Sequence, residues 1–159
     1  MRDTTIYCSS QVRSEWPRVQ APAWLRQYPQ LFDRDDLRLA LSQQRNHFSE
    51  WFAAIHLFQR DGVRALVEKY AFEAHPAKVA RMRRLLDEQD RDRLDALCAE
   101  HQCQPPDLLL YTAKNQLAGF AEVKGPGDRL KPKQASLIRA IERRFAVPVD
   151  FIRVKLIRA

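Results

Sequence analysis

Residues 106–130 read PDLLLYTAKNQLAGFAEVKGPGDRL, and this stretch predicts a β-hairpin. Two apolar segments flank the polar residues 112–116, which favour a turn. Each predicted strand carries charge that a buried strand should avoid, with Asp107 in the first strand and Glu122 and Lys124 in the second. Buried charges are costly unless they are paired or bind a metal ion. A functional site is therefore expected in this hairpin.

The hairpin geometry predicts how these charges meet. Glu122 and Lys124 are two residues apart, so their side chains share one face of the strand. If the turn is centred between Lys114 and Asn115, Asp107 lies directly opposite Glu122, with the Cβ atoms about 4.5–5.5 Å apart. A turn centred on Lys114 itself would put Asp107 on the other face. In the first register two carboxylates repel unless a cation lies between them, and their hard oxygens suit Mg²⁺ or Mn²⁺.

The same residues carry a family resemblance. Asp107 followed by Glu122-Val123-Lys124 resembles the PD-(D/E)XK nuclease signature. The longer run from Glu122 through residues 125–130 to Gln134 resembles the VRR-NUC branch and is much more specific. The resemblance implies an α/β fold with a restriction-endonuclease-like core, in which a small mixed sheet is flanked by helices beneath a helical N-terminal layer. It also implies a metal-dependent DNA nuclease.

A divalent ion between the two carboxylates would suit phosphodiester hydrolysis. Held by Asp107 and Glu122, it would polarise the scissile phosphate and acidify a bound water. By resemblance, the backbone carbonyl of Val123 is the third protein ligand. Lys124 would orient the water or neutralise the charge of the transition state. The implied cofactor is Mg²⁺ or Mn²⁺.

Two further residues complete the predicted catalytic set. The family places a glutamate on a helix before the sheet, and Glu50 matches best, with Glu68 and Glu73 as nearby alternatives. Glu50 would hold a second ion or one of its waters, or else it is a solvated helix residue. Gln134 lies in the first turn of a predicted helix and is expected to bond a water molecule or a phosphate at the site.

Charge points to a polyanionic partner. The net charge is +7, which favours contacts with DNA phosphates. Arg129, Lys131 and Lys133 flank the predicted start of the last helix, where the dipole also favours anions, so they are the candidate DNA-binding residues. The alternative is a solvated run of charge. Such contacts would recognise DNA structure rather than sequence, and Tyr70 and Tyr111 are candidates for base stacking.

The 159 residues are organised as one domain with an N-terminal arm. Residues 1–32 are predicted to be irregular, with Trp16 and Trp24 packing the arm onto the body. Residues 33–159 form the predicted VRR-NUC domain. Its first part, 33–104, is helical, including a short helix or turn over 63–70. Its second part, 105–159, is the catalytic hairpin, a crossover helix and a final strand parallel to its predecessor.

Several classes of protein are disfavoured. No apolar run approaches the roughly 20 residues of a membrane helix, and the N-terminus lacks the apolar core of a secretory signal. Three cysteines are too few for a disulfide framework and predict a cytoplasmic protein. Cys98, His101 and Cys103 lack the fourth ligand and the spacing of a structural zinc site. No surface for a homodimer is evident, and that state is left open.

The predicted function is a metal-dependent DNA nuclease, acting on branched or flapped DNA according to the resemblance alone. One alternative is a non-catalytic nucleic-acid-binding module. The other is a docking subunit of a DNA-processing complex, in which Trp16 and Trp24 would form an exposed patch instead of closing the core.

Overall fold

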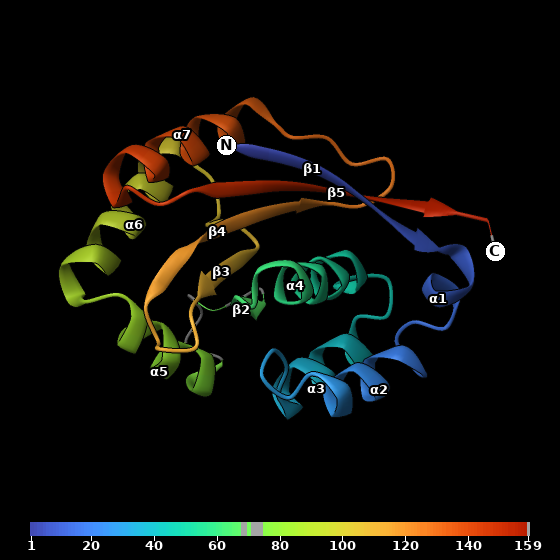
Figure 1. Ribbon diagram of the computed structural model, residues 1–159. Helices are drawn as coiled ribbons and strands as arrows, with labels where there is room; N and C mark the ends of the chain where they lie inside the picture. The colour runs from blue at the N-terminus through green and yellow to red at the C-terminus, as the bar shows by residue number, and fades with distance from the viewer. Residues whose placement is uncertain (68–69, 71–74, 159) are drawn as a thin grey trace.

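A computed structural model describes residues 1–67, 70 and 75–158 of the chain. The described residues form a five-stranded sheet in the order β1-β5-β4-β3-β2, with helices on both faces (Figure 1). The strands are β1 (Arg2–Ser9), β2 (Arg64–Val67), β3 (Leu108–Tyr111), β4 (Leu117–Lys124) and β5 (Val149–Ile157). The helices are α1 (Ser10–Ser14), α2 (Gln20–Gln27), α3 (Arg34–Ser42), α4 (Phe48–Asp61), α5 (Pro76–Leu85), α6 (Glu88–His101) and α7 (Pro132–Phe145). This mixed α/β architecture confirms the predicted fold class.

The β3–β4 hairpin brings Asp107 opposite Glu122 through an irregular ladder. The two strands are antiparallel, and Leu108 lies opposite Ala121. Continuing that register by one residue places Asp107 opposite Glu122. The turn itself is centred on Lys114, because Tyr111 pairs with Leu117 and the N–H of Thr112 donates to the carbonyl oxygen of Gln116 at 2.9 Å, and a register shift between Leu110 and Tyr111 separates the turn from the pairing at Asp107. The crossover is also confirmed, because α7 leads to β5, which pairs in parallel with β4. None of the described helices has the length and apolar character needed to cross a membrane.

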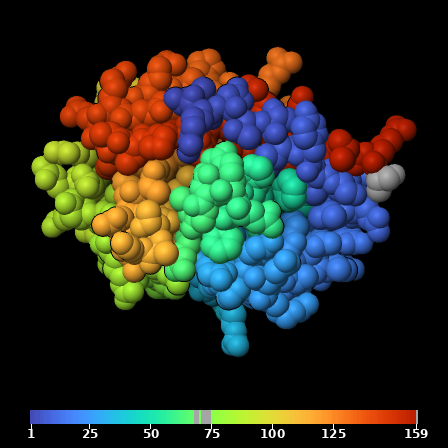
Figure 2. All heavy atoms as spheres, in the orientation of Figure 1, coloured from blue at the N-terminus to red at the C-terminus, as the bar shows by residue number. Residues whose placement is uncertain are grey.

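The prediction of an irregular arm over residues 1–32 is wrong. This segment contains β1, α1 and α2, and β1 pairs in parallel with β5 from Arg2 opposite Asp150 onward. Figure 2 shows the blue atoms of the N-terminal segment lying against the red atoms of the C-terminal segment. Ile6 and Cys8 are buried whereas Tyr7 between them is 59% exposed, which is the alternation of a strand with one covered face.

A second correction concerns residues 63–70, for which the sequence predicts a short helix or turn. Residues Arg64–Val67 instead form β2, an edge strand that pairs antiparallel with β3. A four-residue strand is too short to show a period, and its partner lies more than 40 residues further along the chain. Its hydrogen bonds therefore come from a contact that no local pattern reveals.

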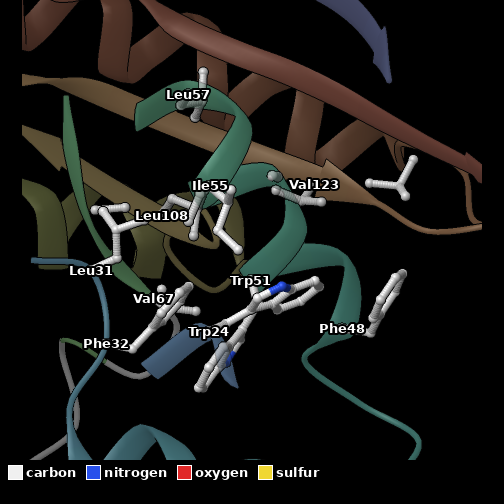
Figure 3. Close-up of a cluster of buried hydrophobic side chains, with 14 of the residues drawn as sticks. Trp24, Leu31, Phe32, Phe48, Trp51, Ile55, Leu57, Val67, Leu108 and Val123 are labelled. Atoms are coloured by element: carbon white, nitrogen blue, oxygen red, sulfur yellow. The ribbon is translucent and has the colours of Figure 1, made fainter. Parts of the chain in front are cut away.

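Two apolar clusters cover the two faces of the sheet. The first packs α1–α4 against one face; its labelled members include Trp24, Phe48 and Trp51 (Figure 3). The second packs α5–α7 against the other face and includes Phe120 of β4. Because side chains alternate, Val123 faces the first cluster, whereas the residues on either side of it in β4 face α7.

Gly119 gives the hairpin a position that no other residue fits well. Its φ is 152°, and an added Cβ would lie 2.5 Å from the carbonyl oxygen of Pro148. We expect Gly119→Ala to lower the free energy of unfolding by about 1–3 kcal/mol or more through strain and backbone displacement, as measured by urea denaturation. Gly62→Ala is the matched control, since Gly62 also has a positive φ but no atom of the described residues lies within 4 Å of its added Cβ. Equal losses in both variants would show that the Pro148 contact is unimportant.

Candidate active site

Asp107 is held at the start of β3 by contacts on both sides. Its Oδ2 accepts a hydrogen bond of 2.8 Å from the backbone N–H of Val123 on β4. The hydroxyl of Tyr70 donates a hydrogen bond of 2.7 Å to the carbonyl oxygen of Pro106, the residue just before it. The Asp107 carboxylate is thereby fixed against the peptide between Glu122 and Val123.

Glu122 is the centre of a second set of contacts. The residue is 6% exposed, and its Oε1 accepts from Nζ of Lys124 at 3.0 Å and from Nε2 of Gln134 at 2.8 Å. The Oε1 of Gln134 in turn accepts a 3.0 Å hydrogen bond from the backbone N–H of Lys131, which anchors that side chain at the start of α7. The structure thus joins three predicted site residues, Glu122, Lys124 and Gln134, across β4 and α7.

A cavity of about 530 Å³ adjoins Asp107. Glu50, in the first turn of α4, lines the same cavity, so these two predicted carboxylates share one opening. Glu122, Lys124 and Gln134 are outside its lining. The predicted residues therefore lie in two groups: Asp107 and Glu50 line the cavity, whereas Glu122, Lys124 and Gln134 lie outside it. The hydrogen bond from the backbone N–H of Val123 to Asp107 connects the two groups. Arg13 and Arg45 also line the cavity; both were missed in the sequence because nothing in their own segments distinguishes them.

The turn after β4 explains how α4 comes so close. Asp128 N–H donates to the Gly125 carbonyl at 3.1 Å, and Gly127 has a φ of 83°, as in a type II turn. An added Cβ on Gly125 would lie 2.8 Å from Oγ of Ser49. Glycine at this position therefore lets the N-terminus of α4, which carries Glu50, pack against the end of β4.

The predicted DNA-binding cations lie next to this group. Arg129, Lys131 and Lys133 are exposed on the segment between β4 and the first turn of α7. Lys133 donates from Nζ to Oε1 of Gln102 at 3.1 Å. These side chains do not line the cavity but occupy the surface beside Gln134, close to where the sequence placed them.

The prediction that two tyrosines stack on bases is wrong. Tyr70 is 1% exposed and Tyr111 2% exposed, so neither ring can reach a ligand base. Burial raises the pKa of Tyr70 well above its ordinary 10.0, and the nearby charges of Cys98, Asp107 and Glu122 raise it further. The Tyr70 hydroxyl therefore keeps its proton and serves as a structural donor. Glu68 and Glu73, the alternatives to Glu50, lie outside the described residues.

The ligand chemistry fits a hard divalent cation. Asp107 and Glu122 would supply carboxylate oxygens from opposite positions of the hairpin, and Val123 a carbonyl oxygen, which are the ligands that Mg²⁺ and Mn²⁺ prefer. Within the described residues there is no group of three or more His, Cys, Asp or Glu side chains placed to hold a metal ion. Burial, followed by the charges of Cys103 and Asp95, raises the pKa of Cys98 to about 12, which disfavours a zinc thiolate.

Comparison with known proteins identifies the family. The model of the VRR-NUC domain family matches residues 13–156. A search of curated proteins found no match. Among solved structures, "Crystal structure of paFAN1 bound to 1nt 5'flap DNA with gap" is similar at 18% sequence identity and a TM-score of 0.41, over 90% of this chain and 24% of that chain. The family match includes every site residue described above and begins upstream of residue 33, whereas β1 and the start of α1 lie outside it. The chain therefore belongs to the VRR-NUC domain family, a family of nuclease domains.

Proposed function

We propose that this chain is a metal-dependent deoxyribonuclease that hydrolyses phosphodiester bonds. The observation that supports this most directly is the contact set around Glu122, in which Lys124 and Gln134 converge on one carboxylate oxygen while Asp107 is bound to the intervening peptide. A buried carboxylate, a lysine and a second carboxylate in a VRR-NUC domain form a set that suits phosphoryl chemistry.

Each residue has a distinct proposed role. Mg²⁺ or Mn²⁺ held by Asp107, Glu122 and the Val123 carbonyl would supply Lewis-acid polarisation of the scissile phosphate. Lys124 places a positive charge beside Glu122, where it can orient the attacking water and offset the charge that develops on phosphorus oxygens. Gln134 holds the Glu122 side chain in position through its amide. Glu50 contributes a further carboxylate from the cavity wall.

The proposed substrate is DNA, bound mainly through its phosphates. Arg13 and Arg45 supply positive charge within the cavity, and the exposed cations between β4 and α7 extend it. Phosphate contacts position a duplex without reading its bases, so recognition would depend on DNA structure. Branched or flapped duplexes are the substrates that the family resemblance implies. A homodimer and a cytoplasmic location stay predictions.

The two alternatives differ in their support. A docking subunit was expected to expose Trp16 and Trp24, but they are 6% and 9% exposed and pack against each other with ring centroids 5.7 Å apart. That patch is therefore not formed. Measuring DNA cleavage distinguishes a non-catalytic binding module from a nuclease.

Metal dependence provides the test of this function. Labelled linear, flapped and four-way DNA is incubated with the protein in Mg²⁺, in Mn²⁺ and in EDTA, and products are resolved on denaturing gels. We expect cleavage with either ion, with flapped or four-way DNA preferred, complete loss in EDTA, and recovery when excess Mg²⁺ is added. Binding without cleavage under every ion would instead support the binding module, and failure to bind DNA at low salt would support the docking subunit.

A further inference from the structure

A second cavity, of about 270 Å³, lies at the other end of β3 from Asp107. Arg64 of β2 lines it, directly opposite Tyr111 of β3, together with Arg81 and Arg84 of α5 and Asn115 of the hairpin turn. The remaining lining residues are Gln30 and Leu85. Figure 1 shows the hairpin turn lying beside α5, which is how the strand edge, the helix and the turn enclose this space.

The charged residues that the structure describes in this cavity are all positive. Of the seven described residues that line it, three are arginines and none is acidic. Within the described part of the chain, Arg64, Arg81 and Arg84 form no ion pair. The Nη1 of Arg81 donates a 2.9 Å hydrogen bond to the hydroxyl of Tyr111, which orients that guanidinium. Like charges gathered in a concave site without carboxylates favour an anionic ligand.

Arg64 adds an independent observation. Among the described residues, its Nε is the single buried side-chain nitrogen or oxygen without a hydrogen-bond partner. Buried donors are nearly always satisfied, so an exception needs an explanation. A guanidinium presents five N–H donors in a fixed plane, which matches the oxygens of a phosphate. The side-chain amide of Asn115 lines the same space and can donate as well.

We propose that this cavity, the arginine pocket, binds a phosphate group of the nucleic-acid substrate outside the catalytic centre. The inference rests on the proposed function, because DNA is the polyanion that function supplies. Tyr111 follows Asp107 by four residues of extended chain, which is about 14 Å at 3.4 Å per residue. Along a duplex this corresponds to about four nucleotide steps, since each strand carries a phosphate every 3.4 Å of axis. The pocket and the cations beside α7 would thus hold the substrate at opposite ends of the hairpin.

The test measures DNA affinity without divalent ions, so that it does not depend on cleavage. Fluorescence anisotropy with a labelled flap DNA compares the wild type, Arg81→Gln/Arg84→Gln and the matched control Arg83→Gln. Arg83 is exposed on the same helix and does not line the pocket. We expect the double variant to bind about tenfold more weakly, with the slope of log affinity against log salt reduced by about one. Arg83→Gln should stay within about twofold. A double variant that matches this control in affinity and slope would overturn the proposal.

Two further arms identify the phosphate. A wild-type preference for 5′-phosphorylated over 5′-hydroxyl DNA, lost in the double variant, would assign the pocket to a terminal phosphate; no preference together with the lost salt slope would assign it to an internal one. Both outcomes support the proposal. If inorganic phosphate raises the Tm of the wild type alone while DNA binding is the same in both proteins, the pocket takes free anions and the proposal fails.

A second variant controls for misfolding of the arginine double variant. Asn115→Asp keeps all three arginines and places a carboxylate among them, and aspartate tolerates the left-handed φ of 58° at this position. It should weaken DNA binding as the arginine double variant does. Cleavage activity decides the proposed function separately. If the protein binds DNA through the arginine pocket but never cleaves it, the proposed nuclease function is wrong and this inference holds. If the protein cleaves DNA and every variant binds DNA as the wild type does, this inference is wrong and the proposed function holds.

Discussion

Lys124→Ala is expected to lower the single-turnover rate of Mg²⁺-dependent cleavage by about 10²–10⁴-fold. The ammonium group lies 3.0 Å from Oε1 of Glu122, and the side chain is 14% exposed. Because little solvent surrounds this group, its interaction with the negative charge of the substrate is only weakly screened. Glu122 keeps its hydrogen bond from Gln134 in the variant. The fold should therefore survive, and thermal unfolding should shift by a few degrees at most. The rate is measured with saturating protein and labelled flap DNA.

The matched control for this variant is Lys114→Ala. Lys114 is exposed in the turn at the far end of the same hairpin, so the substitution removes the same charge without touching Glu122. Its cleavage rate should stay within about twofold of the wild type. Lys124→Met retains most of the aliphatic stem and separates lost packing from lost charge. If Lys124→Met and Lys124→Ala both cut at the wild-type rate, Lys124 has no part in catalysis and the proposed site is wrong.

The parts of the fold that could be predicted are those whose signals are local. The β3–β4 hairpin joins two apolar segments through the five residues 112–116, four of which are polar. The hairpin could therefore be inferred from the sequence, whereas the register shift that leaves Asp107 opposite Glu122 could not. The α7 crossover is similar, because Pro132 marks its start and its apolar residues recur at helical spacing. In both cases the partner element is the next one along the chain.

The two outer strands could not be predicted for the opposite reason. Arg2 of β1 lies opposite Asp150 of β5, near the other end of the chain, and its guanidinium donates to that buried carboxylate at 2.7 Å. Neither residue gives any sign of the other in its own segment. The prolines of the first 30 residues favoured irregular structure, but they follow β1 and do not interrupt it. β2 was not predicted, because a strand of four residues is too short to show an alternation of apolar and polar side chains.

The same distinction holds for the site. Glu122, Lys124 and Gln134 fall within one short motif, and the structure brings them into contact. Arg13 and Arg45 reach the cavity from the N-terminal layer, which packs onto the sheet far along the chain from the motif. Long-range packing of this kind has no local signature. Long-range packing also determines which surface cations lie near the candidate active site. The composition alone does not reveal this.

A buried ion pair joins the N-terminal helices to α5 and carries the largest expected effect on stability. Lys78 of α5 and Asp36 of α3 are each 4% exposed, and their side chains are in direct contact. Lys78 also donates to the carbonyl oxygen of Val67 at the end of β2. Asp36 accepts a 2.9 Å hydrogen bond from the backbone N–H of Asp33 as part of the α3 cap. Burial raises the pKa of Asp36 from its ordinary 3.8 to about 6, although the charge of Lys78 acts to lower it.

Lys78→Met is expected to lower the free energy of unfolding at pH 8 by about 3–5 kcal/mol, because it leaves a buried carboxylate without its cation. Without Lys78 the folded-state pKa of Asp36 must rise further, while the unfolded-state pKa stays near 3.8. The folded state then binds more protons than the unfolded state between those two values, so stability falls as pH rises through the folded pKa. The deficit relative to the wild type should therefore shrink between pH 8 and pH 5. Urea denaturation at both pH values measures it.

Asp36→Asn/Lys78→Met separates the unpaired charge from lost packing. The asparagine keeps an acceptor oxygen for the Asp33 N–H and removes the second buried charge. Because replacing a whole buried ion pair by neutral groups is often close to neutral, the double variant should recover most of the stability at pH 8. Its remaining difference from the wild type should change little between pH 5 and pH 8 compared with that of Lys78→Met. If the double variant is as unstable as the single one, the loss comes from contacts of Lys78 other than the ion pair, such as the one with Val67. A Lys78→Met deficit that is constant with pH would lead to the same conclusion, because an unpaired carboxylate must respond to protons.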